Sequence, residues 1–126
     1  MNHSECPFCT LPLNRIVLMN DYFKVIEDLY PVTDLHLLII PNRHVSSYFE
    51  LSSEETSELV QLLEESRIWL RDRDTNIAGF NIGINDGEVA GQTVMHCHVH
   101  LIPRRPGDSP NPRGGVRGVI PEKQSY

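Results

Sequence analysis

The alternation of hydrophobic and polar positions divides the chain into five strand-like segments and one long amphipathic segment. The strand-like segments cover residues 15–20, 22–28, 35–41, 78–85 and 93–103. In the fourth, Phe80, Ile82 and Ile84 alternate with small or polar residues, a pattern typical of a strand with one small, polar face. Asn20 favours a tight turn between the first two strands, and Pro41 ends the third.

The amphipathic segment predicts one long helix that starts at Ser52 and runs to about Arg73. Ser52 and Glu55 fit a capping box, in which each side chain bonds the other residue's backbone N–H. The apolar stripe of this helix consists of Leu59, Leu62, Leu63 and Trp69. The order of strands, helix and strands predicts an α+β fold: an antiparallel sheet of about five strands with one long helix and short helical turns.

The length of 126 residues predicts a single domain over residues 1–126, with residues 104–126 as an irregular tail rich in Pro, Gly and Arg. The apolar run at 35–41 is too short to span a bilayer, and the first residues lack a signal-peptide pattern. We therefore expect a cytoplasmic protein without a membrane partner. The net charge of −6 argues against binding to nucleic acid, which requires clustered basic residues.

The pentapeptide HCHVH places His96, His98 and His100 at alternate positions, so on a strand they would share one face. Cys97 would point to the opposite face and into the core. Alternate strand residues lie about 6.6 Å apart, so the outer two histidines would be about 13 Å apart. Zinc–nitrogen bonds are only about 2.0–2.1 Å long. A flat strand therefore cannot easily bring all three side chains to one ion, and at least one histidine must have another role.

The residues before this cluster favour phosphate binding. Asn85 and the run Gly91-Gln92-Thr93 offer amides, a hydroxyl and flexible backbone, which can bind phosphate oxygens without basic side chains. A neutral imidazole is a good nucleophile near pH 7, so a histidine could attack phosphorus and form a phosphohistidine-type intermediate. Residues of these types are also common in turns, so a purely structural role is the alternative. The chain contains no GxxxxGK[ST] phosphate loop.

The segment GQTVMHCHVHLIPR, which begins at Gly91, resembles the motif His-φ-His-φ-His-φ-φ of the histidine triad (HIT) superfamily. CPFC, YPVTDLHLLIIPNRHV, the helix and NDGEVAGQ also follow in the order of that family, so the resemblance covers residues 6–104. It implies a HIT-like fold and a bacterial-type HIT hydrolase with an N-terminal CxxC. Such enzymes act on the α-phosphate of adenosine-type nucleotides through a nucleotidyl-histidine intermediate.

The resemblance assigns a role to each polar residue of the predicted site. His98 is the nucleophile, and His100 and His36 contact the phosphate. The nucleotide-binding residues are Asp28 at the ribose and Asn85, Gln92 and Thr93 at the phosphate. The adenine is expected on apolar residues of segment 25–29.

Cys6 and Cys9 form the only CxxC of the chain, so a Cys₄ zinc site within one chain is excluded and any further ligands must be histidines. A metal-free or redox-active CxxC is the alternative. In HIT proteins with an N-terminal CxxC, the histidine of IPxxH and the first triad histidine complete a structural zinc site. The resemblance thus implies Zn²⁺ bound by Cys6, Cys9, His44 and His96, with no catalytic metal required.

The substrate, the presence of turnover, the oligomeric state and the role of the tail stay open at this stage. His100 stands where the uridylyltransferase-like branch has Gln, which favours hydrolysis, and the substrates implied are dinucleoside polyphosphates or nucleoside phosphoramidates. The alternatives are a non-catalytic nucleotide-binding or sensor module and, as a weaker one, a catalytic metal centre. A homodimer is implied by resemblance only. Arg113 and Arg117 in the tail either contact distal phosphates or extend the dimer surface.

Overall fold

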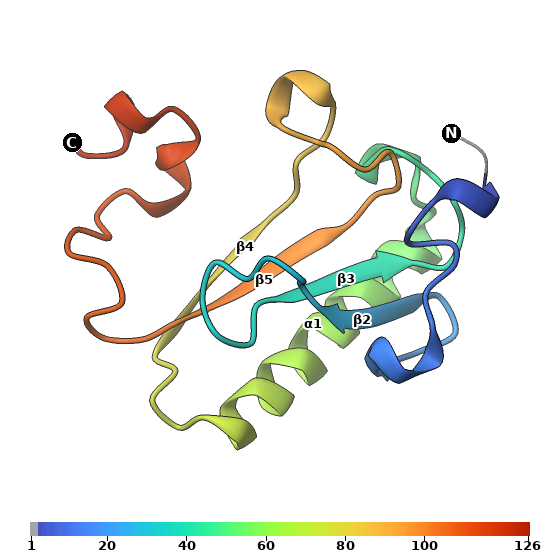
Figure 1. Cartoon of the computed structure of the whole chain (residues 1–126), viewed down its shortest axis with the longest axis horizontal. Coiled ribbons are helices and arrows are strands. Elements are labelled where there is room, and N and C mark those ends of the chain that lie inside the picture. Colours follow the sequence, from blue (N-terminus) through green and yellow to red (C-terminus); the bar gives the residue numbers. More distant parts are fainter. Residues whose placement is uncertain (1–2) are drawn as a thin grey trace.

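The computed structural model describes residues 3–126 and contains a five-stranded antiparallel sheet and one long helix, which confirms the predicted fold class (Figure 1). The strands lie in the order β1-β2-β3-β5-β4. Their bounds are β1 Ile16–Met19, β2 Phe23–Glu27, β3 Leu37–Pro41, β4 Gly79–Gly83 and β5 Val99–Arg104, and helix α1 spans Ser53–Arg73. Short 3-10 helices lie in the connections and in the tail, where η5 covers Gly115–Val119 and η6 Pro121–Lys123. None of the helices in residues 3–126 has the length and apolar character needed to cross a bilayer.

Helix α1 covers one face of the sheet and encloses the main core (Figure 1). The strand register sets Leu37 beside Leu101 and Ile39 beside Val99, so apolar side chains of the two central strands meet on this face. The buried members of the cluster are Phe23, Val25, Leu37, Ile39, Leu59, Leu62, Leu70, Ile77, Val99 and Leu101. Burial of this apolar surface is the main term that stabilises the sheet and the helix together.

The opposite face of the sheet carries the chemistry. Ile26, Leu38 and Ile40 form a second apolar cluster there, which the N-terminal segment covers with Phe8 and Leu11. On the same face, His100 pairs with Leu38 of β3 on one side and Gly83 of β4 on the other. Gly83 has no side chain, so it leaves open space next to the His100 imidazole.

The last strand is shorter than its sequence pattern predicts. We expected it over residues 93–103, but β5 begins at Val99, so only His100 of the three histidines lies on a strand. The backbone bends at residues 94–96, immediately before and within the histidine cluster. The reason is a change of hydrogen-bond partners: the Cys97 N–H donates to the Val45 carbonyl oxygen (2.7 Å) instead of a strand ladder. HCHVH is therefore a bent segment, not a flat strand.

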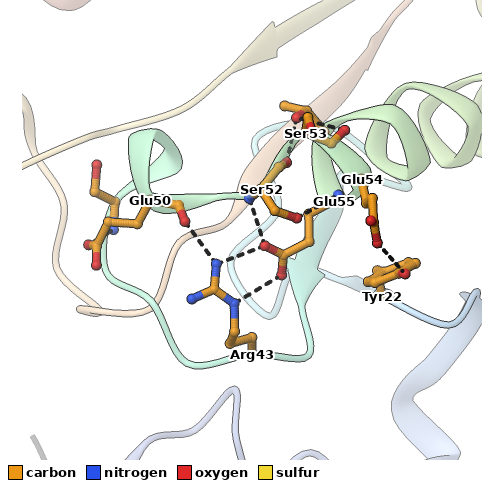
Figure 2. Close-up of polar contacts among 9 residues, drawn as sticks. Tyr22, Arg43, Glu50, Ser52, Ser53, Glu54 and Glu55 are labelled. Atoms are coloured by element: carbon orange, nitrogen blue, oxygen red, sulfur yellow. Dashed lines mark hydrogen bonds and ion pairs between the residues drawn. The ribbon is translucent and has the colours of Figure 1, made fainter.

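Helix α1 begins with the predicted capping box (Figure 2). The Glu55 N–H donates to Ser52 Oγ (3.1 Å), and the Ser52 N–H donates to Glu55 Oε1 (2.8 Å). The buried Glu55 carboxylate also accepts a hydrogen bond from Arg43 Nη2 (2.8 Å), which lowers the pKa of Glu55. Arg43 Nη2 donates in addition to the Glu50 carbonyl oxygen (2.8 Å). The helix start thus fixes the loop that follows β3, in which residue 44 lies.

Ser52→Ala should lower the free energy of unfolding by about 1 kcal/mol, because it removes the acceptor of one helix N–H. Ser53→Ala is the matched control, since Ser53 is equally exposed and its hydroxyl does not cap the helix. Chemical denaturation of both variants checks this. Equal stability of the two variants would contradict a capping role for Ser52.

Candidate functional site

The segment HCHVH contributes to two clusters of polar side chains on the same face of the sheet. One cluster consists of Cys6, Cys9, His44 and His96, and the other of Asp28, His36 and His100. Within each, the potential ligand atoms all lie within 4.8 Å of one another. His98 lies between the two clusters in sequence, and its ring lines a large cleft.

The first cluster has the donor set and spacing of a tetrahedral zinc site. Cys9 Sγ lies 3.1 Å from His44 Nδ1, Cys6 Sγ lies 3.4 Å from His96 Nδ1, and the two Nδ1 atoms are 3.2 Å apart. Zinc bonds of about 2.0–2.3 Å in tetrahedral geometry separate ligand atoms by roughly 3.3–3.8 Å. The four residues therefore fit zinc with only small movements.

His96 is oriented as a ligand by its other ring nitrogen. Its Nε2 lies 2.8 Å from the Pro41 carbonyl oxygen, which can only accept, so Nε2 carries the proton and Nδ1 keeps its lone pair. Burial lowers the pKa of His96, which favours the neutral imidazole that a metal requires. Cys97 is not part of the set, and burial and the nearby Asp86 raise the pKa of its thiol to about 11.

The second cluster is a relay of hydrogen bonds between imidazoles. The Val32 N–H donates to His36 Nδ1 (3.0 Å), so the His36 proton must be on Nε2. His36 Nε2 in turn donates to His100 Nδ1 (3.0 Å), which leaves the His100 proton on Nε2. Asp28 Oδ2 lies 3.6 Å from His36 Nε2. His100 lines the cleft, so this relay provides an oriented N–H donor for a bound anion.

Burial disfavours the charged form of both histidines of the relay. Burial lowers the pKa of His100 to about 4, and the neighbouring His98 and His36 contribute to this shift while Asp28 opposes it. Burial also lowers the pKa of His36, again against Asp28. The donor at His100 is thus an imidazole N–H whose ring is held by His36, because His36 Nε2–H donates to the other ring nitrogen of His100.

His98 has the tautomer that a nucleophile requires. Its Nδ1 lies 2.8 Å from the His96 carbonyl oxygen, so Nδ1 carries a proton, and a ring with that one proton has its free lone pair on Nε2. The residue is only 8% exposed, and its ring centroid is 5.3 Å from that of His100. The rings of His98 and His100 therefore lie next to each other at the cleft.

Three of the four residues predicted to bind the nucleotide line the cleft: Asp28, Asn85 and Thr93. Gln92 is buried instead, and its side chain is fully engaged. The Gly87 N–H donates to its Oε1 (2.8 Å), and its Nε2 donates to the carbonyl oxygens of Ser46 (2.8 Å) and Val94 (3.1 Å). In this arrangement Gln92 holds the loop together, and its expected phosphate contact stays a prediction.

The cleft has a volume of ≈ 1000 Å³, and only some residues of segment 25–29, the expected binding surface for the base, line it. Ile26 and Leu29 line it, whereas Val25 belongs to the core beneath α1, because successive strand residues point to opposite faces. The base-packing expectation for segment 25–29 is thus wrong for Val25. Sequence reasoning also missed Phe8, which lines the cleft. An aromatic side chain between the two cysteines of CPFC was the available signal.

The C-terminal tail forms another wall of the cleft, through residues that include Pro112, Gly115, Val116 and Val119. The guanidinium carbons of Arg113 and Arg117 each lie 4.8 Å from the ring centroid of Tyr126, so both side chains stack on this aromatic ring. Among the described residues, the arginines that line the cleft are Arg15 and Arg104. Neither role expected for Arg113 and Arg117 is tested by this placement.

Comparison with known proteins identifies a HIT domain over residues 13–107. A zinc-bound histidine triad family protein from Mycobacterium smegmatis has a similar structure, with a TM-score of 0.76, 32% identity and coverage of 87% of this chain and 82% of that one. The nitrilase and fragile histidine triad fusion protein NitFhit of Caenorhabditis elegans is 36% identical over 98 residues, which are 78% of this chain but 22% of NitFhit.

Two further similar proteins have named activities. Adenosine 5'-monophosphoramidase HNT1 of Candida albicans is 29% identical to this chain over 115 residues. The match covers 82% of this chain and 73% of HNT1. The Plasmodium falciparum diadenosine triphosphate hydrolase, solved in complex with cyclomarin A, is similar with a TM-score of 0.69 and 26% identity. That match covers 90% of this chain and 74% of the hydrolase.

The zinc site predicts about one zinc ion per chain in protein purified from zinc-supplemented cells. Cys9→Ser should lose most of the zinc and melt at a lower temperature, because one ligand is removed from a site that joins distant segments. Cys97→Ala is the control and should keep its zinc, since Cys97 lies outside the cluster. Atomic absorption measures the content, and wild-type protein with almost no zinc would refute the assignment.

The depressed pKa of His100 predicts a pH dependence of stability. In the unfolded chain histidine takes up a proton near its ordinary pKa of 6.5, whereas burial lowers the pKa of folded His100 to about 4. The free energy of unfolding should therefore fall as the pH decreases through this window. His100→Gln should lose less stability than the wild type between about pH 7 and pH 5, measured by urea denaturation with excess zinc. Parallel pH profiles would contradict the neutral buried state of His100.

Proposed function

Since the chain belongs to the HIT family, we propose that it is a nucleotide hydrolase that cleaves at the α-phosphate of adenosine-type nucleotides through a nucleotidyl-His98 intermediate. The observation that carries this proposal is the state of His98. Its Nδ1–H is held by the His96 carbonyl oxygen, and its ring lies at the cleft with its centroid 5.3 Å from that of His100.

In the first step, the nucleotide binds with its base on Ile26 and Leu29 and its ribose hydroxyls on the Asp28 carboxylate. His98 Nε2 attacks phosphorus, and the bond from phosphorus to the leaving group breaks. The leaving group departs with the bonding electron pair and takes up a proton from water. His98 becomes positively charged, and its hydrogen bond to the His96 carbonyl oxygen stabilises that charge.

In the second step, water attacks phosphorus and displaces the His98 imidazole, which regenerates the enzyme and releases a nucleoside monophosphate and a proton. His100 donates Nε2–H to a non-bridging phosphate oxygen throughout. Its Nδ1 is fixed by the proton of His36, so the donor needs no reorientation as charge develops. No step uses a metal. The zinc held by Cys6, Cys9, His44 and His96 has a structural role in this proposal.

The leaving group lies toward the tail in this proposal, between Arg104 and the wall formed by η5. Dinucleoside polyphosphates and nucleoside phosphoramidates both present a second group that could occupy this part of the cleft. The named activities of the Plasmodium and Candida proteins support one class each. We favour the dinucleoside class because of the sequences GQTV and LIPR around the histidines, and a bacterial-type subfamily because of the N-terminal CxxC.

A nucleotide sensor that binds without turnover is the second candidate, and Gln92 is the observation that favours it. An amide expected to contact the phosphate is engaged with Gly87 and Val94 of its own loop and with the Ser46 carbonyl oxygen of the loop after β3. If these bonds persist when the nucleotide binds, the Gln92 amide cannot donate to the phosphate. The loss of this donor weakens stabilisation of the transition state more than it weakens binding of the nucleotide itself.

We further propose a cytoplasmic homodimer with no nucleic-acid or membrane partner. The edge strand β4 supports a dimer, because its outer side is unpaired and Ile82 on it is 53% exposed. The net charge of −6 supports the exclusion of nucleic acid.

His98→Ala should reduce turnover of a fluorogenic adenosine phosphoramidate and of diadenosine polyphosphates by at least about 10³-fold, because the nucleophile is lost. Rapid acid or alkaline quenching of the wild type should trap a nucleotidyl group on the peptide that contains His98, detectable by mass spectrometry. Cys97→Ala is the control variant and should retain turnover.

The outcome also separates the alternatives. Saturable nucleotide binding by the wild type without any product would establish the sensor. Turnover without an adduct, together with activity in His98→Ala, would favour direct attack by metal-bound water, because that reaction leaves nothing attached to the protein.

A further inference from the structure

Phe8 lies between the two cysteines of CPFC and contacts both a metal ligand and the nucleophile. Its ring centroid is 5.9 Å from that of His96, in an edge-on arrangement of 87°. It is 5.1 Å from that of His98, at an angle of 67°. Edge-to-face pairs are favourable beyond the burial of area, because the positive edge of one ring meets the negative face of the other, so the contact favours one ring orientation.

The position of Phe8 is set by the loop that carries it. The Cys9 N–H donates to the Cys6 carbonyl oxygen (3.2 Å), and Thr10 Oγ1 donates to the same oxygen (3.0 Å). Both cysteine side chains then reach toward His96, with Sγ–Nδ1 distances of 3.4 and 3.5 Å. An ion bound by these ligands would close the loop onto the sheet and press Phe8 against the apolar cluster formed by Ile26, Leu38 and Ile40.

His98 depends on packing for its orientation. The hydrogen bond from Nδ1 to the His96 carbonyl oxygen holds one ring atom, and rotation about the Cβ–Cγ bond of His98 would break it. Among the described residues, the aromatic rings that pack against His98 are those of Phe8 and His100. Without the Phe8 ring, the imidazole could rotate and exchange its tautomer, and Nε2 would lose its alignment with the phosphate.

We propose that Phe8 is a positioning residue for His98, through which the metal site controls the orientation and the tautomer of the nucleophile. The part of this inference that concerns turnover rests on the proposed hydrolase function. The part that concerns the ring of His98 does not depend on any reaction, so the two can fail separately.

The test measures the His98 ring directly, by ¹⁵N–¹H long-range NMR spectra of histidine-labelled, zinc-loaded protein. The wild type should show His98 as the Nδ1–H tautomer, and Phe8→Ala should show a mixture of both tautomers. Phe8→Tyr keeps the ring and should restore the wild-type signature. Leu11→Ala is the matched control, because Leu11 covers the same apolar cluster from the same segment but has no ring contact with His98.

Kinetics provide the second readout. Phe8→Ala should lower kcat by about 10- to 100-fold with little change in KM, because a misaligned nucleophile slows the chemical step. Phe8→Leu preserves apolar volume and keeps the test valid if Phe8→Ala folds poorly, and it should show the same change in tautomer and in kcat. Removal of zinc by a chelator should disturb the His98 signature of the wild type more than that of Phe8→Ala, since Phe8 transmits the effect.

An unchanged His98 signature in Phe8→Ala and Phe8→Leu would overturn the proposal. A rise in KM with constant kcat and an unchanged signature would also overturn it, because Phe8 would then only contact the base. If the wild type shows no turnover but the signatures change as expected, the proposed hydrolase function fails while the positioning role of Phe8 stands.

Discussion

The fixed position of His96 is the constraint on which the rest of the site depends. Its ring donates to the Pro41 carbonyl oxygen through Nε2, its Nδ1 faces Cys6, Cys9 and His44, and its own carbonyl oxygen accepts the proton of His98. One buried residue therefore joins the end of β3, the N-terminal knuckle and the nucleophile. A shift of His96 would change the donor geometry of the metal site and the tautomer of His98 at once.

This arrangement explains how a pentapeptide with three histidines can serve two kinds of chemistry. The chain bends before β5, so His96 turns toward the metal cluster while His100 stays in the sheet beside His36. The three imidazoles then occupy different environments: His96 faces the cysteines, His98 lies at the cleft, and His100 accepts a hydrogen bond from His36. Backbone carbonyl oxygens bind the N–H groups of His96 and His98, whereas the tautomer of His100 is set by the side chain of His36.

Much of this architecture could be predicted from the sequence. The period-two alternation located the strands, and Ser52 with Glu55 marked the start of the helix, because these signals depend on local geometry alone. The pairing of Cys6 and Cys9 with His44 and His96 came from family resemblance, and the structure brings these residues together. The geometric argument that three strand histidines cannot share one ion was correct in its conclusion, although its premise of a continuous strand was wrong.

The rest depends on contacts between residues distant in sequence. The early end of the strand follows from the Cys97 N–H bonding to Val45, and the burial of Gln92 follows from carbonyl groups of another loop. Neither has a local signal. The arginines of the tail were assigned to phosphate or dimer contacts by charge alone, but their stacking on Tyr126 depends on how the tail folds back. Phe8 was missed because its significance lies in two ring contacts, not in its residue type.

The central claim is that HCHVH divides into a metal ligand, a nucleophile and a phosphate donor. A crystal structure of the protein with adenosine monophosphate, with diffraction data collected on both sides of the zinc absorption edge, tests it most directly. The account predicts one anomalous zinc peak among Cys6, Cys9, His44 and His96, and the phosphorus atom about 3–3.5 Å from His98 Nε2 with His100 on a phosphate oxygen. A zinc peak on His98 or His100, or a phosphate bound away from His98, would contradict it.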